Sequence, residues 1–270
     1  MNFLEILNAA WSRNNSLLCV GLDPDLPKIP GHLRSLKCPL FEFNKAIIEA
    51  TADLVCAFKP QAAFYSAFGL EQDLERTITY IHKQYPSLPV ILDAKRGDIG
   101  STAKLYAQEA FDRYRADAVT VNPYLGGDAL DPFLDRKDKG IIILCRTSNP
   151  GATDIQDLEV KGEKLYRVIA RKATKEWNRN GNVLLVVGAT YPRELGEIRA
   201  LAGNMPFLVP GIGVQGGDIE KVVVNGKTPD GTGMIINSSR GILYAEGGKN
   251  FALAARAAAI WLKDEINKYR

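Results

Sequence analysis

Short apolar segments alternate with amphipathic segments along the whole chain, and this alternation restricts the fold more than any other feature. The apolar segments are rich in Val, Ile and Leu and are bounded by Gly, Pro or Asn. They comprise residues 17–22, 54–58, 89–92, 118–121, 141–145, 183–187, 207–209 and 234–236. Because their apolar residues are continuous rather than alternating, they predict parallel strands that are buried on both faces.

Between these segments, apolar residues recur at helical spacing. The predicted helices comprise residues 40–52, 70–84, 102–114, 129–135, 162–177, 193–202, 217–224 and 251–268, with Asn250 as the N-cap of the last. A further helix is expected over 3–13. The order predicts one (β/α)₈ TIM-barrel domain over residues 1–270 with an extra N-terminal helix. A doubly wound open sheet is the alternative. Long loops are expected over 24–39 and 147–160, and such loops often have functional roles.

Composition excludes several classes of protein. The 270 residues are 46% hydrophobic and 24% charged, which is typical of a globular chain and excludes a wholly disordered or fibrous one. The 34 lysines and arginines barely exceed the 31 acidic residues, a balance that does not favour nucleic-acid binding but is compatible with a small anionic substrate. No apolar run is long enough for a membrane helix, and the N-terminus lacks the pattern of a signal peptide.

Cysteine and histidine give little support for metal binding or nucleophilic catalysis. The four cysteines (Cys19, Cys38, Cys56 and Cys145) form no CxxC pair, so we expect reduced thiols in a cytoplasmic protein. The only two histidines, His32 and His82, exclude a multi-histidine metal site and are expected at the surface. A Ser-His-Asp triad is poorly supported for the same reason.

In barrels of this type the active site lies at the C-terminal ends of the strands. Polar or glycine-rich residues follow every predicted strand of this chain. The segments are Asp23-Pro24-Asp25, Lys59-Pro60-Gln61, Asp93 to Asp98, Asn122-Pro123-Tyr124, Arg146 to Asn149, Gly188-Ala189-Thr190, Pro210 to Gly217 and Asn237 to Gly241. We therefore expect one rim of the barrel to gather aspartates, lysines, arginines and glycine-rich turns.

The segments after the seventh and eighth strands predict a phosphate site. Gly211, Gly213 and the glycines after Gln215 allow backbone N–H groups to approach an anion, and a helix begins at Asp218. Arg240 follows the neighbouring strand and can bind phosphate through two hydrogen bonds. Two tight turns that require glycine are the structural alternative.

The third strand carries the residues best suited to proton transfer. Asp93 and Lys95 are two positions apart on a strand, so their side chains are expected on the same side, near Lys59 and Asp23 of the preceding strands. Neighbouring carboxylates raise the pKa of a lysine, which favours a charged proton donor over a Schiff-base lysine. A surface network of ion pairs is the non-catalytic alternative.

The segment Asp93-Ala94-Lys95-Arg96-Gly97-Asp98 resembles the Asp-x-Lys-x-x-Asp motif of the orotidine 5'-phosphate decarboxylase family, in its longer, mainly bacterial branch. The same motif occurs in related magnesium-dependent sugar-phosphate enzymes. The likeness extends over the chain in order, from the first-strand segment ending at Asp25 through Phe58 to Gln61 and Arg146 to Gly151, and on to the phosphate segments. A barrel without metal or organic cofactor is implied.

The resemblance assigns a role to each candidate. It implies that Lys95, Asp93, Asp98 and Lys59 are catalytic, and that Asp23 and Thr102 contact the ribose. Ser148, rather than Thr147 or Asn149, is expected to contact the pyrimidine, and Gln215, Arg240, Gly211 and Gly213 the phosphate. The family also implies a homodimer in which Asp98 and Thr102 reach the neighbouring subunit's site.

The reaction implied is removal of CO₂ from orotidine 5'-monophosphate to give uridine 5'-monophosphate in de novo pyrimidine biosynthesis. Two alternatives stay open at this stage. One is a magnesium-dependent sugar-phosphate lyase or aldolase of the same superfamily, which chelation would inactivate. The other is a barrel that binds a nucleotide without turnover, against which the intact Asp93, Lys95 and Lys59 argue.

Overall fold

The computed structural model describes residues 1–212 and 218–270. Its main sheet has eight strands, and every pair of neighbours is parallel. The order is β2-β1-β10-β9-β8-β5-β4-β3. The strands are β1 Leu18–Leu22, β2 Ala57–Pro60, β3 Ile91–Arg96, β4 Ala118–Val121, β5 Gly140–Arg146, β8 Val183–Val187, β9 Phe207–Pro210 and β10 Met234–Ser238.

The sheet closes on itself between its two ends. Parallel bridges join Phe58 to Val90 and Gln61 to Asp93, which connects the β2 side of the sheet to the β3 side. The predicted (β/α)₈ barrel is therefore confirmed, and the alternative of an open doubly wound sheet is wrong.

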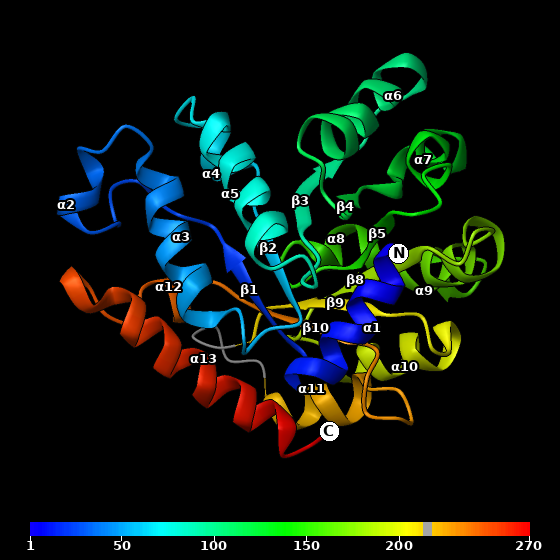
Figure 1. Cartoon of the computed structure of the whole chain (residues 1–270). Coiled ribbons are helices and arrows are strands. Elements are labelled where there is room, and N and C mark those ends of the chain that lie inside the picture. The colour runs from blue at the N-terminus through cyan, green and yellow to red at the C-terminus, as the bar shows by residue number, and fades with distance from the viewer. Residues whose placement is uncertain (213–217) are drawn as a thin grey trace.

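Helices surround the barrel on the outside (Figure 1). The longer ones are α3 Pro39–Thr51, α5 Glu71–Gln84, α6 Gly100–Gln108, α7 Gly127–Leu134, α9 Leu165–Lys172, α10 Pro192–Ala202, α11 Ile219–Gly226 and α13 Phe251–Asn267. Single π-helical turns, η1 Glu109–Arg113 and η3 Ala173–Trp177, extend α6 and α9. Among the described residues, no helix is both long and apolar enough to cross a bilayer.

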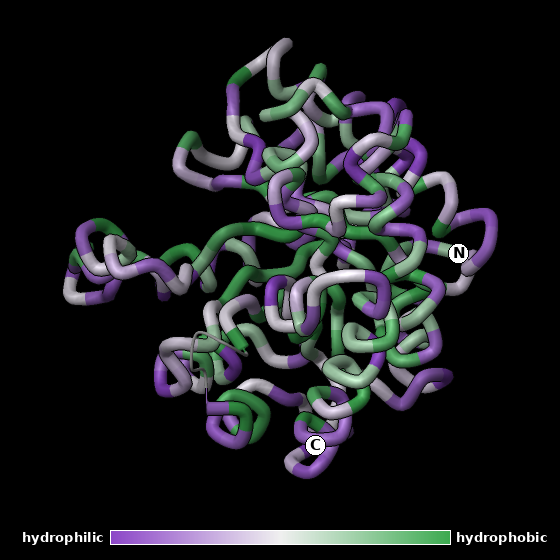
Figure 2. Tube along the Cα trace, turned by 90° about the vertical axis from the view of Figure 1, so that its left-hand side faces the viewer, coloured by the Kyte–Doolittle hydropathy of each residue, from purple (hydrophilic) through white to green (hydrophobic). Residues whose placement is uncertain are grey.

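The core follows the continuous apolar pattern of the strands. All residues of β1, β4 and β8 are buried, as strands covered on both faces require. Figure 2 shows the strongly hydrophobic segments running through the middle of the molecule. All four cysteines are buried and free of disulfide bonds, which confirms the expectation of unpaired thiols.

The N-terminal helix α1 (Phe3–Asn14) covers the end of the barrel where the strands begin (Figure 1). The Trp11 indole donates a hydrogen bond to the carbonyl of Met234, the first residue of β10. The ring of Phe3 packs so closely on Gly140 that a Cβ there would lie 2.5 Å from it. Because α1 covers this end, the opposite end is left for ligands.

Several boundaries differ from those predicted. The segment 54–58 begins as a turn after α3, so β2 starts only at Ala57 and includes Lys59. The two expected loops contain short helices, α2 (Gly31–Arg34) and α8 (Ala152–Gln156). Asn250 precedes α13 but makes no side-chain capping bond, because the chain enters through a 3-10 turn, η4 (Gly248–Asn250).

Candidate active site

Two lysines and one aspartate form a contiguous cluster at the C-terminal ends of β2 and β3. Lys59 Nζ donates to Asp93 Oδ2 at 2.9 Å, and Lys95 Nζ donates to Asp93 Oδ1 at 2.6 Å. Lys59 and Asp93 are buried, whereas the Lys95 side chain is 46% exposed. The Lys95 ammonium is therefore the one of the two that an incoming ligand can reach from the barrel mouth.

The electrostatics of this cluster keep its buried groups charged. Burial opposes the charge of Lys59, but the carboxylates of Asp93 and Asp23 outweigh it and raise its pKa above the ordinary value. Burial also opposes ionisation of Asp93, yet Lys59 and Lys95 hold the pKa of Asp93 well below its usual range. The site therefore presents a fixed carboxylate between two amines.

The prediction that Asp93 and Lys95 lie together is confirmed, but regular strand alternation is not the reason. The register between β3 and β4 shifts between Leu92 and Arg96, and Lys95 has a φ of 47°. A left-handed backbone is unusual for a residue with a side chain. The hydroxyl of Thr120 on β4 contacts both residues at this irregularity, accepting from Lys95 N and donating to Asp93 Oδ1.

Asp23 extends the cluster on the side of β1. Its Oδ1 lies 4.0 Å from Lys59 Nζ, and within the described residues this buried oxygen has no hydrogen-bond partner. Oδ1 of Asn237, on β10, is likewise buried and unpartnered there. Both residues line one pocket, and these two oxygens beside it keep unused acceptor capacity.

Ser148 lies in the same pocket as Asp23, on the loop that follows β5. Gly188 makes room for it, because a Cβ there would lie 2.9 Å from the Ser148 backbone nitrogen. Gly211, where a Cβ would lie at an ordinary contact distance of 3.6 Å from Ser148, has a φ of 102°, which a residue with a side chain rarely adopts. Gly188 thus has a steric reason to be glycine, and Gly211 has a conformational one.

The loop that carries Ser148 is attached to the barrel through Arg146. This side chain is 1% exposed and stacks on the Tyr191 ring at 4.0 Å. Its guanidinium also makes long bonds of 3.4 Å to Gln156 and Asp157 at the far end of the loop. Gln156 in turn accepts from the backbone N–H of Thr147. Arg146 therefore belongs to the support of this loop rather than to its ligand surface.

The phosphate residues are placed only in part. Arg240 begins α12 (Arg240–Leu243), is exposed, and lines the same pocket as Asp23 and Ser148. Asp218 caps α11 by accepting from Lys221 N, as expected for the start of that helix. Gly213 and Gln215, which were also assigned to the phosphate, lie outside the described residues.

Asp98 and Thr102 do not join the cluster of their own chain. The Asp98 carboxylate accepts from the adjacent Ile99 N at 2.8 Å and forms no ion pair within the described part of the chain. Thr102 is exposed on the first turn of α6. Gly97, which packs on Asn122, lies between the cluster and Asp98. Within the described part of the chain, neither Asp98 nor Thr102 therefore bonds to the Lys59–Asp93–Lys95 cluster.

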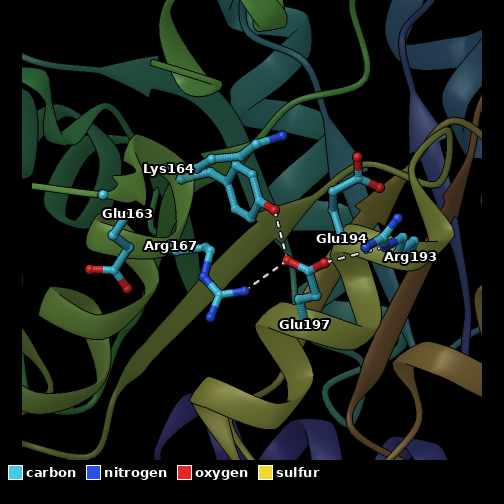
Figure 3. Close-up of a pocket in the computed structure, with 8 residues that line it drawn as sticks. Glu163, Lys164, Arg167, Arg193, Glu194 and Glu197 are labelled. Carbon is cyan, nitrogen blue, oxygen red and sulfur yellow. Dashed lines mark hydrogen bonds and ion pairs between the residues drawn. The ribbon is translucent and has the colours of Figure 1, made fainter. Parts of the chain in front are cut away.

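A second pocket, of about 540 Å³, lies on the outside of the barrel between α9 and α10 (Figure 3). Glu197 accepts from Tyr166 and Arg167, and Arg193 lies 3.5 Å from it. The basic groups here are paired with carboxylates, Arg167 and Arg193 with Glu197 and Lys164 with Asp157, so within the described residues this pocket offers no unpaired cation to an anionic ligand. Elsewhere in 1–212 and 218–270, no three His, Cys, Asp or Glu side chains are grouped as metal ligands would be.

Sequence reasoning missed Thr120, and it placed Asn237 among the polar residues after the eighth strand without giving it a role. Thr120 interrupts an otherwise apolar strand, since β4 reads Ala-Val-Thr-Val. A buried polar side chain requires a partner, so such an interruption is a usable signal. Thr120 lies inside its strand, so it is not among the polar segments that follow the strands.

The mouth of this (β/α)₈ barrel holds fixed charged groups beside a pocket that contains an arginine and unpartnered acceptors. Such a site defines an enzyme class that acts on small anionic substrates. The family model described as "Orotidine 5'-phosphate decarboxylase / HUMPS family" matches residues 16–255. The chain belongs to this family.

Individual relatives agree over the full length. The chain is 59% identical to the orotidine 5'-phosphate decarboxylase of Dechloromonas aromatica (strain RCB), with all of both chains covered. The structure of Leishmania donovani OMP decarboxylase is 42% identical with a TM-score of 0.86, covering 100% of this chain and 98% of that one. Leishmania donovani UMP synthase is 44% identical with a TM-score of 0.89, but this chain covers only 56% of it.

Proposed function

We propose that this chain is a carboxy-lyase that removes CO₂ from orotidine 5'-phosphate and leaves uridine 5'-phosphate. The observation that carries the proposal is the Lys59–Asp93–Lys95 cluster, in which one carboxylate is held ionised between two amines. Full-length relatives named for this activity, at 57–59% identity, support it.

In this reaction Lys95 supplies the proton. Loss of CO₂ leaves an electron pair on the ring carbon, and the ammonium stabilises that developing charge before it protonates the carbon. The Lys95 side chain is the half-exposed member of the cluster, so its Nζ can meet a substrate atom. Lys59 is buried behind Lys95 and raises the positive potential there.

Asp93 lies beside the departing carboxylate in this proposal. Two unit charges about 4 Å apart repel by about 4 kcal/mol at an effective dielectric near 20. Enzymes lower barriers by about 8–23 kcal/mol, so relief of this repulsion is a minor part. Preorganised charge from Lys95 and Lys59 provides the main part, because Asp93 already holds both ammonium groups in place before the reaction begins.

The pocket beside the cluster suits the rest of a nucleotide. Asp23 and Asn237 line it, and side-chain oxygens of this kind accept from ribose hydroxyls, which are donors. Ser148 contacts the pyrimidine, while Arg240, Gly211, Gly213 and Gln215 bind the phosphate. Phosphate contacts far from the reacting carbon supply binding energy that offsets strain at the carboxylate.

We also propose a homodimer in which Asp98 and Thr102 complete the neighbouring subunit's site. Ile99 and Leu105 flank these residues and are 59% and 63% exposed. Tyr124, 80% exposed, and Ile155 line an apolar pocket of about 390 Å³ near the same rim. Large exposed apolar groups around a polar pair are typical of an interface, and a second copy of this chain would cover them.

Three further assignments belong to the proposal. The chain works as one barrel domain over residues 1–270, in the cytoplasm, and without metal or organic cofactor. The aspartates of the site are paired with lysines rather than with each other, which supports a mechanism that uses ammonium groups as the cations.

One assay tests the reaction. Purified protein is mixed with orotidine 5'-phosphate in the presence of EDTA, and the loss of orotidylate absorbance is followed together with the release of CO₂. Turnover that is insensitive to EDTA supports the proposal. Activity that disappears on chelation and returns with magnesium would show a metal-dependent lyase instead, and nucleotide binding without turnover would show a non-catalytic barrel.

A further inference from the structure

One hydroxyl in the interior of the barrel has all of its hydrogen-bonding capacity used by two residues of the site. Thr120, on β4, is 1% exposed. Its Oγ1 accepts from the backbone N–H of Ala94 at 3.1 Å and of Lys95 at 2.9 Å. The same hydroxyl donates to Asp93 Oδ1 at 2.8 Å. These contacts span 25 to 27 residues of sequence, so they depend on the pairing of β3 with β4.

The direction of the hydroxyl proton follows from counting. A threonine hydroxyl has one donor and two acceptor positions. Two amide N–H groups occupy both acceptor positions, so the proton is directed at Asp93 Oδ1. That oxygen also receives the Lys95 ammonium at 2.6 Å, while Oδ2 receives Lys59 at 2.9 Å. The arrangement is satisfied only when Asp93 is ionised.

The same hydroxyl lies at the backbone irregularity that orients Lys95. Lys95 has a φ of 47°, and the β3–β4 register shifts between Leu92 and Arg96. A residue with a side chain keeps a left-handed backbone only where surrounding contacts require it. Thr120 provides such contacts, because its hydroxyl accepts from two consecutive amides at this irregularity.

We infer that Thr120 is a positioning residue that fixes the Lys95 ammonium and the Asp93 carboxylate in their working geometry. It acts through those two residues and does not itself touch substrate. The inference rests on the proposed function, because its effect is read from turnover of orotidine 5'-phosphate.

Thr120→Val tests this, since valine keeps the shape of threonine and lacks the hydroxyl. We expect kcat to fall by about 10- to 100-fold, the loss typical of a displacement of about 1 Å in a catalytic group. KM should change by less than about threefold, because the substrate contacts remain. Thr120→Ser, which restores the hydroxyl, should recover most of the activity.

The pH profile separates positioning from a general loss of stability. The groups that face Asp93 are Lys59 from β2, Lys95 from its own strand and Thr120 from β4, with Asp23 and Cys19 of the β1 side beyond Lys59. Removing one donor from the carboxylate favours its protonated form. The acidic limb of the kcat/KM profile should therefore move to higher pH in Thr120→Val and return in Thr120→Ser.

A second buried threonine supplies the control. Thr51, the last residue of α3, is fully buried, and its hydroxyl donates to the carbonyl of Ile47 at 2.7 Å, so this bond stays within its own helix. Thr51→Val should leave kcat and the pH profile unchanged. Should the valine variant at 120 not fold, Thr120→Ala is compared with Thr120→Ser by the same measurements.

Distinct outcomes overturn the two proposals. The first case is one in which wild type and Thr51→Val turn over the substrate. If Thr120→Val then has the same activity and the same pH profile, the proposed role of Thr120 is contradicted. A serine variant as defective as valine, or a Thr51→Val variant with the same loss, contradicts it too. If wild type itself shows no turnover, the proposed function fails instead.

Discussion

Lys59 and Asp93 form a buried ion pair that spans the closure of the barrel, with Nζ of the lysine 2.9 Å from Oδ2 of the aspartate. The pair joins β2 to β3, the two strands that end the hydrogen-bonded order of the sheet. Sheet hydrogen bonding at this seam is limited to isolated bridges. The charges that serve the reaction therefore also link the sheet where its ladder is weakest.

Lys59→Met should destabilise the protein and make its stability less dependent on pH in the acidic range. Removing one partner from a buried pair costs about 3–5 kcal/mol, and we expect the lower end because Lys95 and Thr120 still contact Asp93. The folded pKa of Asp93 lies below its ordinary value of 3.8, so its stabilising contribution is present above that pH and is lost as the pH falls through the folded pKa.

In Lys59→Met the folded pKa of Asp93 rises, because burial remains and one cation is gone. The pH window in which stability is lost, from the ordinary aspartate value down to the folded pKa, then becomes narrower, so acid should remove less stability from Lys59→Met than from wild type. Urea unfolding from pH 7 down to pH 3, a range of about four units that enters this window, measures the difference. Parallel pH curves for the two proteins would contradict the coupling of Lys59 to Asp93.

Lys95→Ala should abolish turnover while uridine 5'-phosphate still binds. The variant lacks the proton donor, whereas the ribose, pyrimidine and phosphate contacts remain. Calorimetry of product binding beside the absorbance assay separates the two effects. Lys83→Ala, at an exposed lysine on α5, is the control and should keep wild-type kcat. If Lys95→Ala turned over the substrate at the wild-type rate, Lys95 would not be the proton donor.

Arg240→Ala should raise KM for orotidine 5'-phosphate strongly, because a charge-assisted contact to the phosphate is lost. Such contacts contribute about 1.5–3 kcal/mol, which corresponds to an increase in KM of about 10- to 150-fold. Decarboxylation of orotidine, which lacks the phosphate, should hardly change. Arg193→Ala on α10, whose side chain is 90% exposed, is a matched control. Equal losses on both substrates would show that Arg240 does not contact the phosphate.

Mixing two inactive variants tests the shared site. Lys95→Ala and Asp98→Ala are combined and allowed to exchange subunits. In a hybrid dimer one site receives both defects and the other neither, so about a quarter of wild-type activity should return if the two-fold interface is isologous. Mass spectrometry of mass-labelled subunits confirms the exchange. Exchange without recovered activity would show that Asp98 serves its own subunit.

The barrel and the placement of its site could be predicted from local patterns. Continuous apolar segments between helical ones require strands buried on both faces, and 118–121 and 183–187 match β4 and β8 residue for residue. Because all strands are parallel, the polar residues that follow them must gather at one rim. This reasoning predicts the positions of Asp23, Lys59, Asp93 and Lys95, and all four lie at that rim.

The geometry within that rim depended on contacts between distant segments. Strand alternation does not predict the left-handed backbone of Lys95, which arises where β3 shifts its register against β4 and Thr120 binds the displaced amides. Likewise, Asp98 lies beyond Gly97 and leaves its own cluster, although it belongs to the same motif. A periodic pattern records which face of a segment is buried, whereas register and the turns after a strand are set by the neighbours against which the chain packs.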